Sequence, residues 1–91
     1  MNTPINFQKT VTTAGTAETL ISTNEYGYVI VKALESNTSN IYVGDSDVTS
    51  ANGYILESGE SISIALDGIN KVYIDSDVNG EGVSAFGVVQ K

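Results

Sequence analysis

Two D-S-D motifs, at residues 45–47 and 75–77, carry the side chains in this 91-residue sequence that are best suited to bind a metal ion. Hard cations such as Ca²⁺ prefer carboxylate and carbonyl oxygens. The metal candidates are therefore Asp45, Asp47, Asp75 and Asp77. A calcium loop of the EF-hand type needs further ligands and a Glu at its twelfth position, which both motifs lack. The alternative is an Asx turn that ends a strand, and we expect no metal and no other cofactor.

The residue types that most often build catalytic sites are either absent from the chain or do not occur in a catalytic pattern. The chain has no His and no Cys, which removes the common nucleophile–base pairs. A Ser–Lys dyad is formally possible, but nothing in the sequence desolvates a lysine beside a particular serine. A pair of glycosidase carboxylates would lie in an apolar cleft, whereas the acidic residues of this chain lie mostly in turns. The Gly80-Glu81-Gly82 motif is followed by no helix, so it predicts no phosphate loop. We expect no enzymatic activity.

The charge balance indicates which partners the protein avoids. Eleven acidic residues against four lysines give a formal net charge of −7. The lysines form no cluster, so the sequence disfavours binding to nucleic acid or to an anionic membrane. The first ten residues, MNTPINFQKT, lack the basic and apolar regions of a signal peptide. Because there is no Cys, we expect no disulfide.

Alternation of apolar and polar residues predicts an all-β domain of seven or eight short antiparallel strands. The cleanest alternation spans residues 61–66 and directs Ile62, Ile64 and Leu66 to one face. Turn signals recur about every 8–12 residues, which is typical of a small β-sandwich of immunoglobulin-like or jelly-roll topology. No segment sustains a helical period. The predicted core comprises Ile30, Val31, Ile41, Val43, Ile62, Ile64, Val72 and Ile74.

A short repeat relates two of the predicted strands. Residues 41–48, IYVGDSDV, align with residues 72–78, VYIDSDV, when Gly44 is treated as an insertion. Two interpretations remain open: two turns that use the same favoured residues, or a pseudo-symmetric pair of strands in one sheet. Tyr42 and Tyr73 occupy matching positions on the predicted outward face, where an aromatic ring would contact a protein or stack on a sugar.

Contacts with other subunits are expected to support this small domain. At this length, and without disulfides, a single core is thin. The strand from Tyr26 to Leu34 is largely apolar on both faces, as if a neighbouring subunit covered one of them. Residues 1–7 are predicted to form an N-terminal arm that reaches a partner, and residues 8–91 to form the sandwich. The interface candidates are Ile5, Phe7, Val29, Val31, Tyr42 and Tyr73.

A set of motifs extends from Val11 to Val88. They are VTTAGTA at 11–17, VIVKAL at 29–34, SNTSNIYVG at 36–44, NG at 52–53, LESGESI at 56–62, VYID at 72–75 and NGEGVS at 79–84. In this combination the chain resembles a group of small β-rich proteins encoded among the virion structural genes of tailed bacteriophages. The resemblance implies a jelly-roll-like sandwich and a homo-oligomer, most often a trimer. It also implies a place in the virion, as a capsid decoration, head-fibre, spike or tail component made in the bacterial cytoplasm, with capsid or tail proteins as partners.

The alternative function is a carbohydrate-binding β-sandwich module that attaches to the host surface. Tyr42, Tyr54 and Tyr73 would then form the stacking platform. The absence of Trp, which offers the largest stacking surface, counts against this interpretation.

Overall fold

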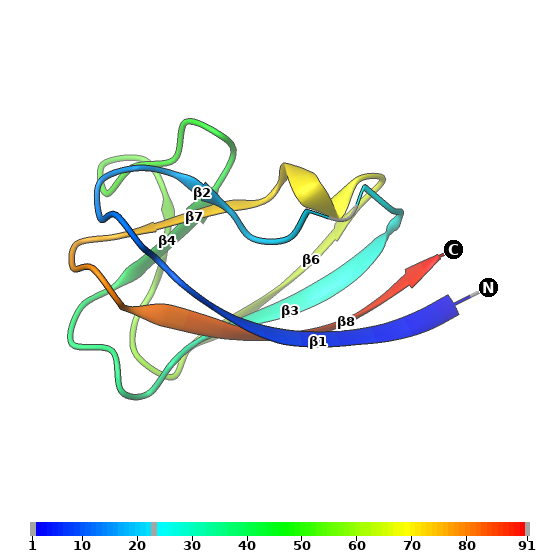
Figure 1. Ribbon diagram of the computed structural model, residues 1–91, viewed down its shortest axis with the longest axis horizontal. Helices are drawn as coiled ribbons and strands as arrows, with labels where there is room; N and C mark the ends of the chain where they lie inside the picture. Colours follow the sequence, from blue (N-terminus) through cyan, green and yellow to red (C-terminus); the bar gives the residue numbers. More distant parts are fainter. Residues whose placement is uncertain (1, 23, 91) are drawn as a thin grey trace.

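Two antiparallel sheets pack face to face in the computed structural model, which describes residues 2–22 and 24–90 (Figure 1). Sheet A contains, in order across the sheet, β1 (Asn2–Thr10), β8 (Gly82–Gln90), β3 (Gly27–Ala33) and β6 (Ser61–Leu66). Sheet B contains β2 (Glu18–Thr19), β7 (Tyr73–Ser76), β4 (Ile41–Gly44) and β5 (Tyr54–Leu56). Within the described ranges the only helical element is the 3-10 turn η1 (Ile69–Lys71).

The strand pairing is that of a jelly roll. β1 pairs with β8, β2 with β7, β3 with β6, and β4 with β5, so the chain follows the path of one long hairpin wrapped into two sheets. Further antiparallel pairing joins β3 to β8 and β4 to β7. The prediction of an all-β, jelly-roll-like sandwich with seven or eight strands is confirmed.

The core lies between the two sheets and follows the alternation of each strand. On β3, Val29 and Val31 are fully buried, while Ile30 between them is 40% exposed. The predicted core is therefore wrong at Ile30, because both faces of this strand are apolar and the pattern alone does not say which one is covered. It is confirmed for Val31, Ile41, Val43, Val72 and Ile74, with Ile62 and Ile64 packed against these at the edge.

The N-terminal segment is part of sheet A. The prediction of a separate arm over residues 1–7 is wrong for residues 2–7, and Met1 lies outside the described residues. β1 pairs with β8 along its whole length, from Asn2 opposite Gln90 to Thr10 opposite Gly82. Local sequence does not reveal this pairing, because the partner strand lies at the opposite end of the chain. Both termini consequently lie at the same end of the molecule (Figure 1).

Glycines allow the two central strands of sheet A to approach closely. A Cβ atom added at Gly87 would collide with the backbone oxygen of Tyr28, and one added at Gly27 would collide with that of Val88. The register continues through Gly87, which lies opposite both Ile5 and Val29. A glycine inside a strand often marks a bulge, but Gly87 forms none, and its role is close packing of two backbones.

The two halves of the sequence repeat are neighbours in sheet B. β4 and β7 pair antiparallel, with Tyr42 opposite Asp75 and Val43 opposite Ile74. Of the two interpretations of the repeat, the pseudo-symmetric strand pair is the one that the structure shows.

Candidate functional site

Three of the four candidate metal ligands, Asp45, Asp75 and Asp77, accept hydrogen bonds through their carboxylates within the protein. The Asp45 carboxylate accepts the N–H of Asp47 at 3.0 Å, which is an Asx turn. Asp75 is 2% exposed and accepts the N–H groups of Gly15 and Ser76 at 2.9 and 2.8 Å. Asp77 accepts the hydroxyl of Tyr42 at 2.8 Å. In the described part of the chain, no three acidic, His or Cys side chains gather in a group that could hold a metal.

Loops cover the outer face of sheet B. Tyr42 is only 6% exposed, so the prediction that it lies on an exposed outward face is wrong. The loop from residue 45 to 53 folds over it, with Val48 buried, and a Cβ atom added at Gly53 would lie 2.6 Å from the Cβ of Tyr42. The hydrogen bond to Asp77 and burial raise the pKa of the Tyr42 phenol.

The predicted tyrosine platform is not formed as a unit. Tyr73 is half-buried, whereas Tyr54 is 58% exposed on the short edge strand β5. With Tyr42 buried beneath the 45–53 loop, the three rings do not make one exposed stacking surface. This outcome reflects a long loop that packs on the sheet, which strand alternation does not predict.

Two glutamates fix loops of the sandwich through hydrogen bonds to backbone N–H groups. One oxygen of Glu81 accepts the N–H groups of Thr38 and Ser39, both at 2.7 Å, and their hydroxyls at 3.2 Å. Burial raises the pKa of Glu81, but the hydrogen bonds outweigh it and lower the pKa below the usual carboxyl range. Glu18 accepts the N–H groups of Thr12 and Thr13 and pairs with Lys9 at 3.1 Å. Against the raising effect of burial, these contacts lower its pKa.

Among residues 2–22 and 24–90, no loop covers the outward side of sheet A in this way. Cross-strand pairs place Tyr28 beside Val88 and Ile30 beside Phe86. Tyr28, Ile30 and Phe86 are 41%, 40% and 51% exposed, and Tyr26, just before β3, is 58% exposed. We use the name "outer face" for the outward-directed residues of sheet A and Tyr26. These are Asn2, Pro4, Asn6, Gln8, Thr10, Tyr26, Tyr28, Ile30, Lys32, Ser61, Ser63, Ala65, Ser84, Phe86, Val88 and Gln90.

Acidic residues are excluded from the outer face. None of the 11 acidic residues of the chain falls within β1, β3, β6 or β8. Lys32 is the single charged residue of the outer face, and its ammonium lies 3.2 Å from the Glu35 carboxylate in the following loop. Aromatic and aliphatic side chains at the centre, surrounded by serines and amides, have the composition of a protein interface, whose centre is depleted of charge.

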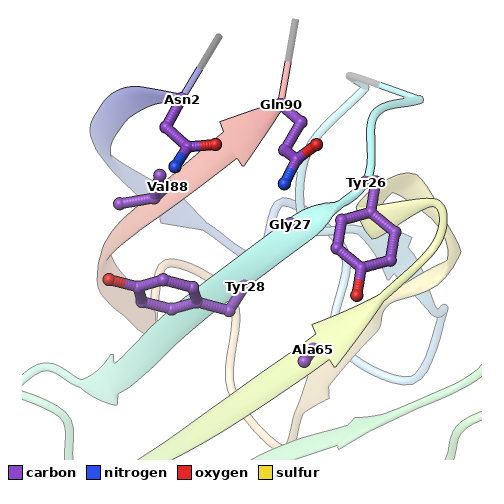
Figure 2. A pocket seen from close by; sticks show the side chains of 7 residues that line it. All are labelled: Asn2, Tyr26, Gly27, Tyr28, Ala65, Val88 and Gln90. Carbon is purple, nitrogen blue, oxygen red and sulfur yellow. The ribbon is translucent and has the colours of Figure 1, made fainter.

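A shallow hollow of about 230 Å³ lies at one end of the outer face (Figure 2). The Tyr26 and Tyr28 rings point to different sides of Gly27, and the amides of Asn2 and Gln90 project from the neighbouring strand ends (Figure 2). Asn2 and Gln90 are direct cross-strand partners. Ala65 and Val88 complete the lining. The hollow therefore offers two aromatic rings and two neutral amides, each amide with donors and an acceptor.

Four of the six interface candidates from the sequence lie on the inward side of sheet A, and the other two, Tyr42 and Tyr73, lie on sheet B. Val29 and Val31 are fully buried in the core, which contradicts their assignment to an interface. Ile5 and Phe7 are half-buried, and Phe7 packs against the core. Sequence reasoning missed Tyr28 and Phe86. Lys32 was the available signal, because a lysine in an apolar strand marks the face that meets water.

No protein-family model matches the chain, and no curated protein matches it. In residues 2–22 and 24–90, no helix is long and apolar enough to span a membrane.

Proposed function

We propose that the protein is a non-enzymatic accessory component of a tailed-phage virion and acts through protein–protein contacts made by its outer face. The observation that carries this proposal is the apolar, acid-free composition of the outer face in a molecule with a net charge of −7. The motif resemblance over residues 11–88 supports the virion setting. The partners proposed are further copies of the chain and the capsid or tail proteins of the phage.

The contrast between the two sheets supports the choice of surface. Loops and acidic side chains close the outer face of sheet B over Tyr42 and Asp75. On sheet A, Ile30 and Phe86 lie side by side and remain about half exposed. Full burial of a side chain of this kind contributes about 1.5–3 kcal/mol relative to exposure. A few such side chains are enough to drive a specific contact once a partner covers them.

The test is co-sedimentation with capsids and with tails purified from the phage that encodes the protein. We expect the wild type to co-sediment with one of them. The double variant Ile30→Ser/Phe86→Ser should bind at least tenfold more weakly, equivalent to a loss of about 1.4 kcal/mol. Ile55→Ser is the control, since Ile55 is 52% exposed, close to Phe86 at 51%, but lies on the outward side of sheet B. The proposal is overturned if the wild type binds neither particle, or if the double variant binds as well as the control.

One observation favours a second candidate function, the binding of a neutral saccharide in the hollow beside Tyr26 and Tyr28. Aromatic rings stack on the apolar faces of sugars, and the amides of Asn2 and Gln90 can donate and accept hydrogen bonds. The hollow is formed by residues other than the platform expected from the sequence. A glycan array with the wild type, Tyr28→Ala and the control Tyr54→Ala tests this candidate. Specific binding that Tyr28→Ala abolishes supports it, and an array without binding removes it.

A further inference from the structure

Four strands form the edges of the two sheets, and three of these edges are protected against pairing with another chain. β2 and β5 are only two and three residues long. β1 contains Pro4, and Lys9 on its inward side forms an ion pair with Glu18. Short length, proline and inward-directed charge are the features by which natural proteins prevent edge-to-edge association.

The fourth edge, β6, has none of these features. Its six residues, SISIAL, include no charge, no proline and no glycine. It pairs with β3 on one side, from Lys32 opposite Ser61 to Gly27 opposite Leu66, without a bulge. Outside this ladder, the described residues make no hydrogen bond to the backbone of residues 61–66. In an antiparallel sheet, alternate residues of such a strand direct their N–H and C=O groups away from the partner strand. β6 is therefore ready to accept another strand.

The inward side chains of β6 are also incompletely covered. Ile62, Ile64 and Leu66 are half-buried, whereas Val29 and Val31 on the adjacent strand are fully buried. They border a largely apolar groove of about 420 Å³ between the sheets, which Val43, Tyr54 and Val72 line from the other side and to which Asp45 and Lys71 also contribute. The groove opens beside β6 because β5, the edge of the opposite sheet, is short. A strand added to β6 would place alternate side chains in this groove.

We propose that β6 pairs antiparallel with β6 of a second copy across a two-fold axis, which joins two copies of sheet A into one continuous sheet. The segment is self-complementary, since it is uncharged and alternates regularly, as an isologous interface requires. Side chains stay on their proper faces only if residues of equal parity oppose each other. The two-fold axis must therefore pass through a residue and not between two. Pairing is longest when this residue is one of the two at the centre of β6, Ser63 or Ile64.

The proposed dimer does not depend on the virion role. It would make the outer faces of two copies continuous, giving one apolar surface free of acidic residues on a single side of the dimer. It closes with two copies, unlike the trimer that the resemblance implies. The expected species in solution is thus a dimer.

Sedimentation equilibrium over a dilution series tests the assembly. The wild type should show twice the mass of the chain at high concentration. Ser63→Lys should weaken dimerisation at least tenfold, because it brings like charges close together near the axis. Gln8→Lys is the matched control, since it adds the same charge at an exposed position on the other edge of sheet A. A monomer at every concentration, a trimer, or a dimer unaffected by Ser63→Lys would each overturn the proposal.

Oxidative cross-linking checks the register, because the chain contains no Cys of its own. Ser63→Cys should cross-link with itself if the axis passes through Ser63. If the axis passes through Ile64, a mixture of Ser63→Cys and Ala65→Cys chains should cross-link instead. Gln8→Cys should not cross-link. If neither pair forms a disulfide, the β6 contact is refuted even where a dimer exists. Particle binding by a strictly monomeric wild type would refute the dimer and leave the proposed function standing.

Discussion

Buried polar side chains in this protein replace missing strand partners. Asn37 donates its amide N–H to the Gly82 carbonyl at 2.8 Å and accepts the Gly82 N–H at 2.9 Å, as an adjacent strand would. Glu81 satisfies two successive backbone N–H groups at Thr38 and Ser39 in the same loop. Because an unpaired buried N–H is costly, these side chains fix the loop between β3 and β4 to the start of β8. The role of both side chains is structural, although a buried glutamate such as Glu81 could be taken from the sequence for a catalytic residue.

The lowered pKa of Glu81 predicts how stability depends on pH. A carboxyl group whose pKa is lower in the folded state stabilises the fold fully above its ordinary value of 4.5, and this contribution is lost as pH falls through the lowered pKa. Glu81→Gln should therefore lower the melting temperature by several degrees at neutral pH and flatten the decline in acid. Thermal denaturation followed by circular dichroism at neutral and acidic pH measures both effects. Glu57→Gln, at an exposed position, serves as the control, and an unchanged acid profile in Glu81→Gln would contradict the assignment.

Tyr42 should stabilise the fold through its hydroxyl as well as its ring. Tyr42→Phe removes the hydrogen bond to Asp77 and should cost about 1 kcal/mol of unfolding free energy. Because the pKa of Tyr42 is raised in the folded state, its contribution is present below the ordinary value of 10.0 and is lost as pH rises through the raised pKa. Urea denaturation at neutral and alkaline pH should show a smaller alkaline loss in the variant. Tyr54→Phe should behave like the wild type, since Tyr54 is exposed.

At the scale of elements, the close approach of β3 and β8 depends on glycine. Gly87→Ala directs a Cβ atom into the backbone oxygen of Tyr28 and the region of Val29. Neither strand can move away without disturbing its other neighbour, so we expect a loss of about 1–3 kcal/mol, typical of overpacking. Urea denaturation of Gly87→Ala and of Ser84→Ala, on the same strand, gives the comparison. Equal stability of the two variants would show that the strands adjust freely.

The elements illustrate what local sequence can predict. Alternation predicted the strand at 61–66 and its inward residues, because one face there is polar. It did not choose between the faces of β3, because Ile30 and Val31 are equally apolar and only sheet packing decides which is buried. The burial of Tyr42 and the pairing of β1 with β8 depend on contacts between distant segments. The outer face was missed for the same reason, since it gathers Tyr28 and Phe86 from strands far apart in the sequence.

At the scale of the molecule, charge and exposed apolar surface are separated. All 11 acidic residues lie outside the strands of sheet A, whose outer face exposes Tyr28, Ile30 and Phe86. A net charge of −7 keeps copies apart in most orientations. Approach through the outer face of sheet A avoids direct contact between carboxylates, whereas antiparallel pairing of β6 brings Glu60 and Asp67, which flank the strand, near those of the second copy. The charge distribution therefore determines in which orientation two copies can approach, and it does not itself attract them.

Salt should consequently strengthen self-association. Two molecules of charge −7, placed about 25 Å apart as the molecular extents of 38 × 25 × 19 Å allow, repel by about 8 kcal/mol in unscreened water. Screening leaves roughly 3–4 kcal/mol at about 0.01 M salt and less than 1 kcal/mol at about 0.15 M. The dimer dissociation constant, measured by sedimentation equilibrium, should thus fall at least tenfold between these conditions. A contact based on ion pairs would instead weaken with salt. The sign of the salt dependence therefore distinguishes an uncharged β6 edge from an electrostatic contact.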